Sequence, residues 1–178
     1  MLSLNLYYYS YLASQVSTQL NAVQYSQQYA YADDIENALS GMSYNSKTVT
    51  TAEARNATLA NGGYTDPPYQ AGSPVIGFKP TQSTGNTYVM VKNTNPINSG
   101  SFIAKASDIQ GLTPAQIRSR FALNYTPTHY CYVTIDSGVQ IYTGIAGSNY
   151  GMMGGGTQFD IYGQIGSSVH FGVTYILP

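Results

Sequence analysis

The chain has 178 residues, of which 43% are apolar and only 8% are charged. This combination is typical of one compact domain with its own core, and it excludes a disordered chain, which pairs low hydrophobicity with high charge. Seven Lys and Arg residues against eight Asp and Glu residues give a formal net charge of −1. We therefore expect no nucleic-acid partner, because non-specific binding to a phosphate backbone depends on clustered cations.

The polar surface is expected to consist mainly of uncharged hydrogen-bonding groups, because the chain has eighteen Tyr and eighteen Gly residues but few charged ones. Cys131 is the only cysteine, which excludes an intrachain disulfide framework and a cysteine-cluster zinc site, and with two His we expect no metal. No run of about 18 apolar residues exists, so no membrane-spanning helix is expected. The neutral surface and scarce cysteine suit a protein that is secreted or delivered to a target cell.

Residues 1–43 are predicted to be a helical segment. Residues 2–42 contain no Pro and a single Gly near their end, and apolar residues recur at helical spacing in two stripes. These stripes are Leu12, Val16, Leu20 and Val23, and Ile35, Ala38, Leu39 and Met42. Asp33 and Asp34 favour the start of the second helix. The segment either packs on the downstream core, which we favour, or serves as a partner or assembly helix for a homo-oligomer.

Residues 44–66 are predicted to be a linker, because Gly, Pro and Asn clusters interrupt any regular pattern there. Residues 67–178 then form the domain proper, in which β-rich runs alternate with turns. The expected strands are residues 87–92, 101–104, 130–135, 139–144, 159–165 and 170–177. Residues 136–138 read as a hairpin turn between the third and fourth strands, and the last two strands read as a closing pair.

One short helix is predicted to interrupt these strands. Thr113 can cap it, Pro114 fits its first position, and Gln116 completes a capping box. The predicted fold class is therefore α+β: an N-terminal helical segment followed by a mostly antiparallel β domain with one short interrupting helix.

The most informative motif is the glycine-rich segment at residues 154–159, with the sequence GGGTQF. Gly154, Gly155 and Gly156 allow close approach of the backbone to a ligand, and their N–H groups can face phosphate oxygens. The same glycines are also compatible with a plain turn.

Several segments together resemble a known family. The motif at 154–159, the segments GSFIA at 100–104 and RFAL at 120–123, and His129 follow the order and spacing of its motifs. Residues 75–159 thus resemble the tuberculosis necrotizing toxin family of NAD glycohydrolases and related C-terminal toxin domains of bacterial polymorphic toxins. The resemblance implies a toxin-like catalytic domain at residues 67–178. It would release nicotinamide from NAD, with NAD as substrate and no cofactor, and would be held in check by an immunity protein.

The resemblance also assigns roles to individual residues. Gln158 matches the catalytic glutamine, and Arg120 matches an arginine that binds the dinucleotide phosphates, for which a guanidinium is well shaped. Phe102 matches an aromatic residue on the nicotinamide side. The family has a second arginine where this chain has Met90, so Lys92 or Lys79 is the candidate for the second phosphate-binding cation. His129 is a candidate for orienting substrate or carrying a proton.

Asp160 lies two residues after Gln158 and thus on the same strand face, so its carboxylate is expected to stabilise positive charge on the ribose.

Three alternatives stay open at this stage. ADP-ribosyl transfer would use the same residues. A ribonuclease toxin domain would use His129, His170, Arg118 and Arg120. A non-catalytic surface or assembly protein would use the Tyr-rich exterior for protein contacts.

Overall fold

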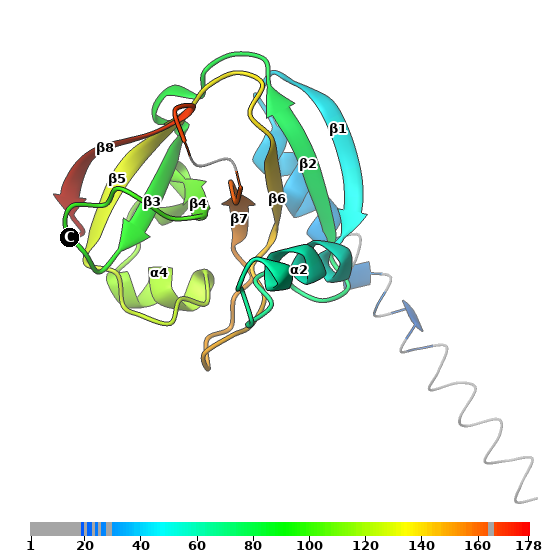
Figure 1. Cartoon of the computed structure of the whole chain (residues 1–178). Helices are drawn as coiled ribbons and strands as arrows, with labels where there is room; N and C mark the ends of the chain where they lie inside the picture. Colours follow the sequence, from blue (N-terminus) through cyan, green and yellow to red (C-terminus); the bar gives the residue numbers. More distant parts are fainter. Residues whose placement is uncertain (1–18, 20, 23, 25, 28–29, 164–165) are drawn as a thin grey trace, which may run out of the picture.

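One antiparallel sheet organises the molecule (Figure 1). The computed structural model describes residues 19, 21–22, 24, 26–27, 30–163 and 166–178. The eight strands of these residues are β1 (Tyr44–Thr51), β2 (Pro74–Pro80), β3 (Tyr88–Lys92), β4 (Phe102–Lys105), β5 (His129–Ile135), β6 (Ile141–Ile145), β7 (Thr157–Asp160) and β8 (Val169–Ile176). Their order is β1-β2-β6-β7-β4-β3-β5-β8, with each neighbouring pair antiparallel.

A few helices accompany this antiparallel sheet, so the predicted α+β fold class is confirmed. They are α2 (Ala52–Asn61), α3 (Ala106–Ile109), α4 (Pro114–Arg120), the 3-10 turn η1 (Gly85–Thr87) and a helical stretch over residues 30–39. None of the described helices is long and apolar enough to cross a membrane.

The alternation of side chains along the strands separates two faces. Tyr88, Met90, Ile103 and Phe159 point into the main core, which the stretch over residues 30–39 completes. Their sequence neighbours Val89 and Ala104 pack on the opposite face, the outer face, against α4. Farther along the outer face, α2 packs on β2 and β6 through Leu59 and Val75. The outer face therefore carries two separate helical covers with the middle of the sheet between them.

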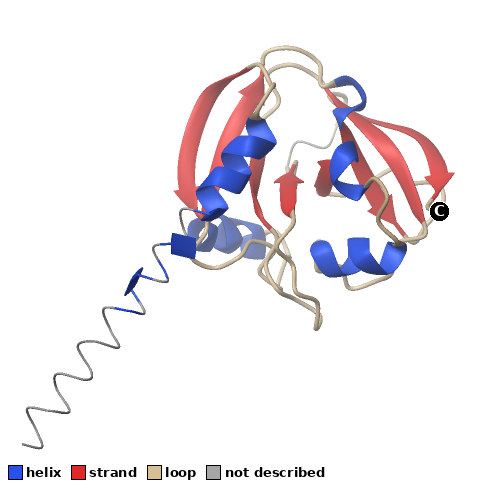
Figure 2. Cartoon of the chain, turned by 180° about the vertical axis from the view of Figure 1, so that it is seen from behind, coloured by secondary structure: helices blue, strands red, loops and turns tan. Residues whose placement is uncertain are grey.

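The helix over residues 30–39 packs on the core face, as favoured from its apolar stripe. Ile35, Ala38 and Leu39 are buried in the main core, and Met42 packs against it. Figure 2 shows this helix in front of the strands and α2 behind them. Asp33 and Asp34 lie inside this helix rather than at its start, which corrects the prediction. The first predicted stripe (Leu12, Val16, Leu20 and Val23) lies outside the described residues.

The prediction of a linker over residues 44–66 is wrong, because most of this range belongs to the sheet domain. β1 pairs with β2 along the edge of the sheet, and Thr51 caps α2 by accepting a hydrogen bond from the Ala54 N–H. β2 itself was not predicted. The Gly and Pro clusters form the turns between these elements. The side chains that bury β1, α2 and β2 come from segments distant in the sequence.

Two predicted strand pairings are also wrong. β5 pairs with β3 and β8, and β6 pairs with β2 and β7, so residues 136–138 connect different parts of the sheet rather than closing a hairpin. β7 pairs with β4 and β6, so it does not form a closing pair with β8. The predicted helix is confirmed as α4, with Thr113 and Gln116 forming the reciprocal capping box.

Candidate functional site

A cavity of about 260 Å³ lies on the outer face of β3, β4 and β7, between the helical covers. Its floor is formed by Val89, Val91, Phe102, Ala104 and Gln158. One wall comes from the loop after α2 (Tyr64, Asp66, Pro68) and the β6–β7 loop (Gly147, Asn149, Tyr150), and the other comes from residues 121–125. Lys92, Gly100, Ser101 and Ile103 complete the lining. Mostly apolar walls with a few polar groups are typical of a small-molecule site.

Strand register explains why these floor residues meet. Val89 lies opposite Ala104 in the β3–β4 ladder, and the β4–β7 ladder pairs Phe102 with Asp160 and Ile103 with Phe159. Because faces alternate along a strand, Gln158 falls on the same face as Phe102. The small side chain of Ala104 leaves room above the middle strand.

Gln158 is the polar group of the cavity floor. Its side chain is only 6% exposed, and its amide nitrogen donates a hydrogen bond of 2.8 Å to the carbonyl oxygen of Pro68. Its amide oxygen has no hydrogen-bond partner among the described residues. The side chain is thus fixed by one end while its acceptor stays free for a ligand hydroxyl or a water molecule.

Phe102 and Lys92, two further predicted site residues, line the same cavity. The Phe102 ring meets Tyr64 edge to face, with centroids 5.3 Å apart. Lys92 is the last residue of β3, two strands away from Gln158. The structure therefore brings together Gln158, Phe102 and Lys92, which come from three different strands.

Tyr125 closes the wall opposite the α2 side. Its hydroxyl donates a hydrogen bond of 3.0 Å to the carbonyl oxygen of Val91. Burial raises the pKa of this phenol to about 12.

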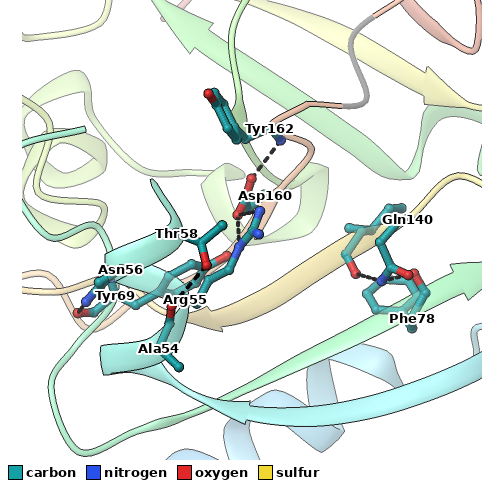
Figure 3. Close-up of polar contacts among 10 residues, drawn as sticks. Ala54, Arg55, Asn56, Thr58, Tyr69, Phe78, Gln140, Asp160 and Tyr162 are labelled. Atoms are coloured by element: carbon teal, nitrogen blue, oxygen red, sulfur yellow. Dashed lines mark hydrogen bonds and ion pairs between the residues drawn. The ribbon is translucent and has the colours of Figure 1, made fainter. Parts of the chain in front are cut away.

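Asp160 does not line the cavity, contrary to the prediction. It is fully buried beneath α2, where its Oδ2 lies 2.8 Å from Nε and 2.6 Å from Nη2 of Arg55 (Figure 3). The Tyr162 N–H donates to Oδ1 at 2.7 Å. Burial raises the pKa of Asp160, while Arg55 and this N–H act in the opposite direction. A carboxylate held in this way ties β7 to α2 and cannot reach a ligand.

The three glycines do not form a phosphate cradle either. The N–H groups of Gly154, Gly155 and Gly156 donate to the carbonyls of Ser119, Ala146 and Arg120, at 2.9 Å in each case. None of the three lines the cavity beside Gln158. Gly154 and Gly156 serve close packing: a Cβ on Gly154 would lie 2.5 Å from the Ala146 carbonyl oxygen, and one on Gly156 would lie 2.8 Å from Arg120 Cγ. A Cβ on Gly155 would meet nothing within 4 Å, but its φ of +88° is in the region that favours glycine.

Arg120 is separated from Gln158. It lines a second, polar cavity of about 530 Å³ with Gly155 and Thr157, whereas its neighbour Phe121 lines the first. The two cavities share no lining residue. The Gln158 amide and the Arg120 guanidinium, expected to bind one ligand, thus belong to residues that line different cavities, and Lys92 is the basic residue in the lining of the Gln158 cavity.

The four ribonuclease candidates are not gathered at one place. His129 pairs with Ile176 and His170 pairs with Thr134, so the two histidines lie at opposite ends of the β5–β8 ladder. The His129 Nδ1 contacts the Thr128 hydroxyl, and His170 pairs with Asp136 at the surface. Arg118 donates to the Leu123 carbonyl, and neither histidine lines a cavity described above.

Sequence reasoning missed one wall of the cavity. Tyr64, Asp66 and Pro68 fall within or beside the range predicted to be a linker, and Tyr150 lies four residues before the glycine-rich segment at 154–159. The Asp-Pro-Pro sequence was visible as a turn signal, but its place beside β7 depends on contacts between segments about 90 residues apart.

Comparisons with known proteins found no match. No protein-family model matches the chain, and no match was found among curated proteins or among solved structures. Within the described residues, no group of three or more His, Cys, Asp or Glu is arranged to hold a metal ion.

Proposed function

We propose that the chain is a toxin-type NAD glycohydrolase whose site is the Gln158 cavity. The observation that carries the proposal is that Gln158, Phe102 and Lys92, selected from sequence for an amide, an aromatic and a cationic role, line one cavity. Its volume of about 260 Å³ is near the lower end for small-molecule sites, and it suits the nicotinamide and ribose end of NAD.

In the proposed reaction, the bond between the nicotinamide nitrogen and ribose C1′ breaks, and its electron pair stays on nicotinamide. A water oxygen bonds to C1′ and releases a proton, which gives nicotinamide, ADP-ribose and H⁺. The transition state resembles an oxocarbenium ion, so the enzyme has to orient the ribose and the water and to exclude bulk solvent.

Each of the three residues has a specific task in this proposal. The free amide oxygen of Gln158 accepts a hydrogen bond from the attacking water or a ribose hydroxyl. Phe102, with Tyr64 beside it, packs against the nicotinamide ring. Lys92 binds the diphosphate as a point charge, which is weaker and less directional than a bidentate arginine.

The test is nicotinamide release from NAD by the full chain, followed by chromatography. Gln158→Ala should lower turnover by about tenfold or more, which corresponds to about 1.4 kcal/mol of lost transition-state stabilisation. The matched control is Gln140→Ala. Gln140 is also an amide that donates to carbonyl oxygens, those of Phe78 and Ile141, but it lies outside the cavity (Figure 3).

Two results would contradict the proposal. One is the absence of nicotinamide release by the folded full chain, and the other is equal release by the wild type and Gln158→Ala. Release of nicotinamide with ADP-ribose recovered on a protein acceptor, rather than free in solution, would instead assign ADP-ribosyl transfer to the same cavity.

A further inference from the structure

The charges of the Gln158 cavity are separated between its two sides. Its lining contains one carboxylate, Asp66, and one ammonium, Lys92. Asp66 belongs to the loop that is hydrogen-bonded to β7, whereas Lys92 lies on β3, with β4 between them. The two side chains form no ion pair with each other. The lining of this cavity therefore has one acidic residue on the side of the loop after α2 and one basic residue at the end of β3.

Several donors hold the segment that carries Asp66. The Tyr150 hydroxyl donates to Asp66 Oδ2 at 3.0 Å, and Asn149 Nδ2 donates to the Pro67 carbonyl at 2.7 Å. The Pro68 carbonyl accepts from the Gly147 N–H as well as from Gln158, both at 2.8 Å. Asp66 is therefore fixed relative to Gln158 through a short chain of hydrogen bonds, rather than placed on a free loop.

Aromatic rings surround the carboxylate side of the cavity. Tyr64 and Tyr150 line the same wall as Asp66, and Phe102 lies on the floor against Tyr64. Ring faces attract cations, and they also pack well against another planar ring. A carboxylate among aromatic rings is thus suited to a ligand group that is both planar and positively charged.

We propose that the Asp66 side of the cavity is a recognition site for a cationic aromatic ring, with the anionic part of the same ligand directed toward Lys92. For NAD the cationic ring is the pyridinium of nicotinamide, and this identification rests on the function proposed above. This role differs from the one expected of Asp160, which was to stabilise positive charge on the ribose. Asp66 acts as a specificity-determining residue, because it gives the charged ring a higher affinity than its neutral counterpart.

The test compares two small probes, the 1-methylnicotinamide cation and neutral nicotinamide, by calorimetry with the full chain. The wild type should bind the cation about fivefold more tightly, and Asp66→Asn should bind the two probes equally. Asn has nearly the same shape and still accepts from Tyr150, so this variant removes the charge alone. A thermal melt checks that each variant is folded.

Two controls separate charge at the site from other effects. Asp108→Asn removes the same charge from the second cavity and should keep the fivefold preference. Tyr150→Phe removes the hydrogen bond but keeps the carboxylate, and it should also keep a preference for the cation. Equal binding of both probes by the wild type, a preference that persists in Asp66→Asn, or binding of neither probe would overturn the inference.

The inference and the proposed function can fail separately. A cation preference that depends on Asp66, without any release of nicotinamide from NAD, would keep the recognition site and remove the hydrolase. Release that depends on Gln158, with no preference between the two probes, would keep the hydrolase and remove the recognition site.

Discussion

Arg55 and Asp160 are 105 residues apart in sequence, yet they form a buried ion pair. Asp160 is fully buried and Arg55 is 8% exposed. The Arg55 guanidinium also lies over the Tyr142 ring, 3.8 Å from its centroid. The pair joins α2, which composition assigned to a linker, to β7, which carries Gln158.

Asp160→Asn should therefore destabilise the protein strongly. The substitution leaves the Arg55 charge buried without its partner, which costs about 3–5 kcal/mol. Urea unfolding followed by circular dichroism measures this loss. Asp136→Asn is the control, because its pair with His170 is exposed and should contribute less than about 1 kcal/mol. Similar losses for both variants would contradict a structural role for the buried pair.

Gly154→Ala and Gly151→Ala separate steric contact from backbone strain. The two glycines have nearly equal φ, +70° and +72°, but a Cβ on Gly154 meets two carbonyl oxygens, whereas one on Gly151 meets nothing within 4 Å. Gly151→Ala should cost about 1 kcal/mol from the left-handed conformation. Gly154→Ala should cost about 3 kcal/mol or more in the same unfolding assay. Equal costs would mean that the glycine-rich segment is not packed as described.

Tyr125→Phe should change how stability depends on pH above 10. Because the folded-state pKa is raised to about 12, the folded state keeps a proton that the unfolded state loses near pH 10. Stability therefore falls as pH rises between about 10 and 12, by up to about 1.4 kcal/mol per pH unit for this group. The variant should show a shallower decline in urea unfolding across that range. An unchanged slope would mean that the half-buried Tyr125 phenol does not keep its proton in the folded state above pH 10.

Thr113→Ala should destabilise α4 and with it one wall of the cavity. The Thr113 hydroxyl accepts from the Gln116 N–H, and loss of such a cap costs about 1 kcal/mol. Thr58→Ala is a suitable comparison, because Thr58 lies within α2 and bonds only to the Ala54 carbonyl of its own helix. Thermal unfolding should show a clear decrease for the first variant and little change for the second.

The elements predicted correctly are those with a local physical cause. Thr113, Pro114 and Gln116 specify the start of α4 within four residues. The run at 130–135 forms a strand because its residues favour β structure, which is also a local cause. The pairing partners of β5 and β6 were mispredicted, because residues 136–138 have turn composition but contain no information about which strands lie nearby. Register depends on burial across the whole sheet.

In the candidate site, too, some features follow from the local sequence and others depend on distant segments. Phe102 and Gln158 share a cavity because strand alternation directs them to one face, and this relationship follows from sequence once the strands are correct. Lys92 lines the same cavity, although alternation along β3 places it on the face of Met90 rather than that of Val89. Asp160 obeys the same alternation, but Arg55 arrives from a helix that was not predicted and covers it. The glycine N–H groups could not be predicted either. Nothing in the local sequence indicates that they donate hydrogen bonds to the carbonyls of Ser119, Ala146 and Arg120.

The pairing of β1 with β2 and the position of α2 also limit how the chain can be divided. A fragment that begins at residue 67 would lack both elements, so it would leave the edge of β2 open and remove Ala52 and Leu59 from the apolar cluster around Tyr69 and Val75. It would also leave Asp160 without a cation. The smallest unit that keeps this core when expressed alone must therefore carry Arg55 and begin ahead of residue 30, because Ile35 and Leu39 are buried in the main core.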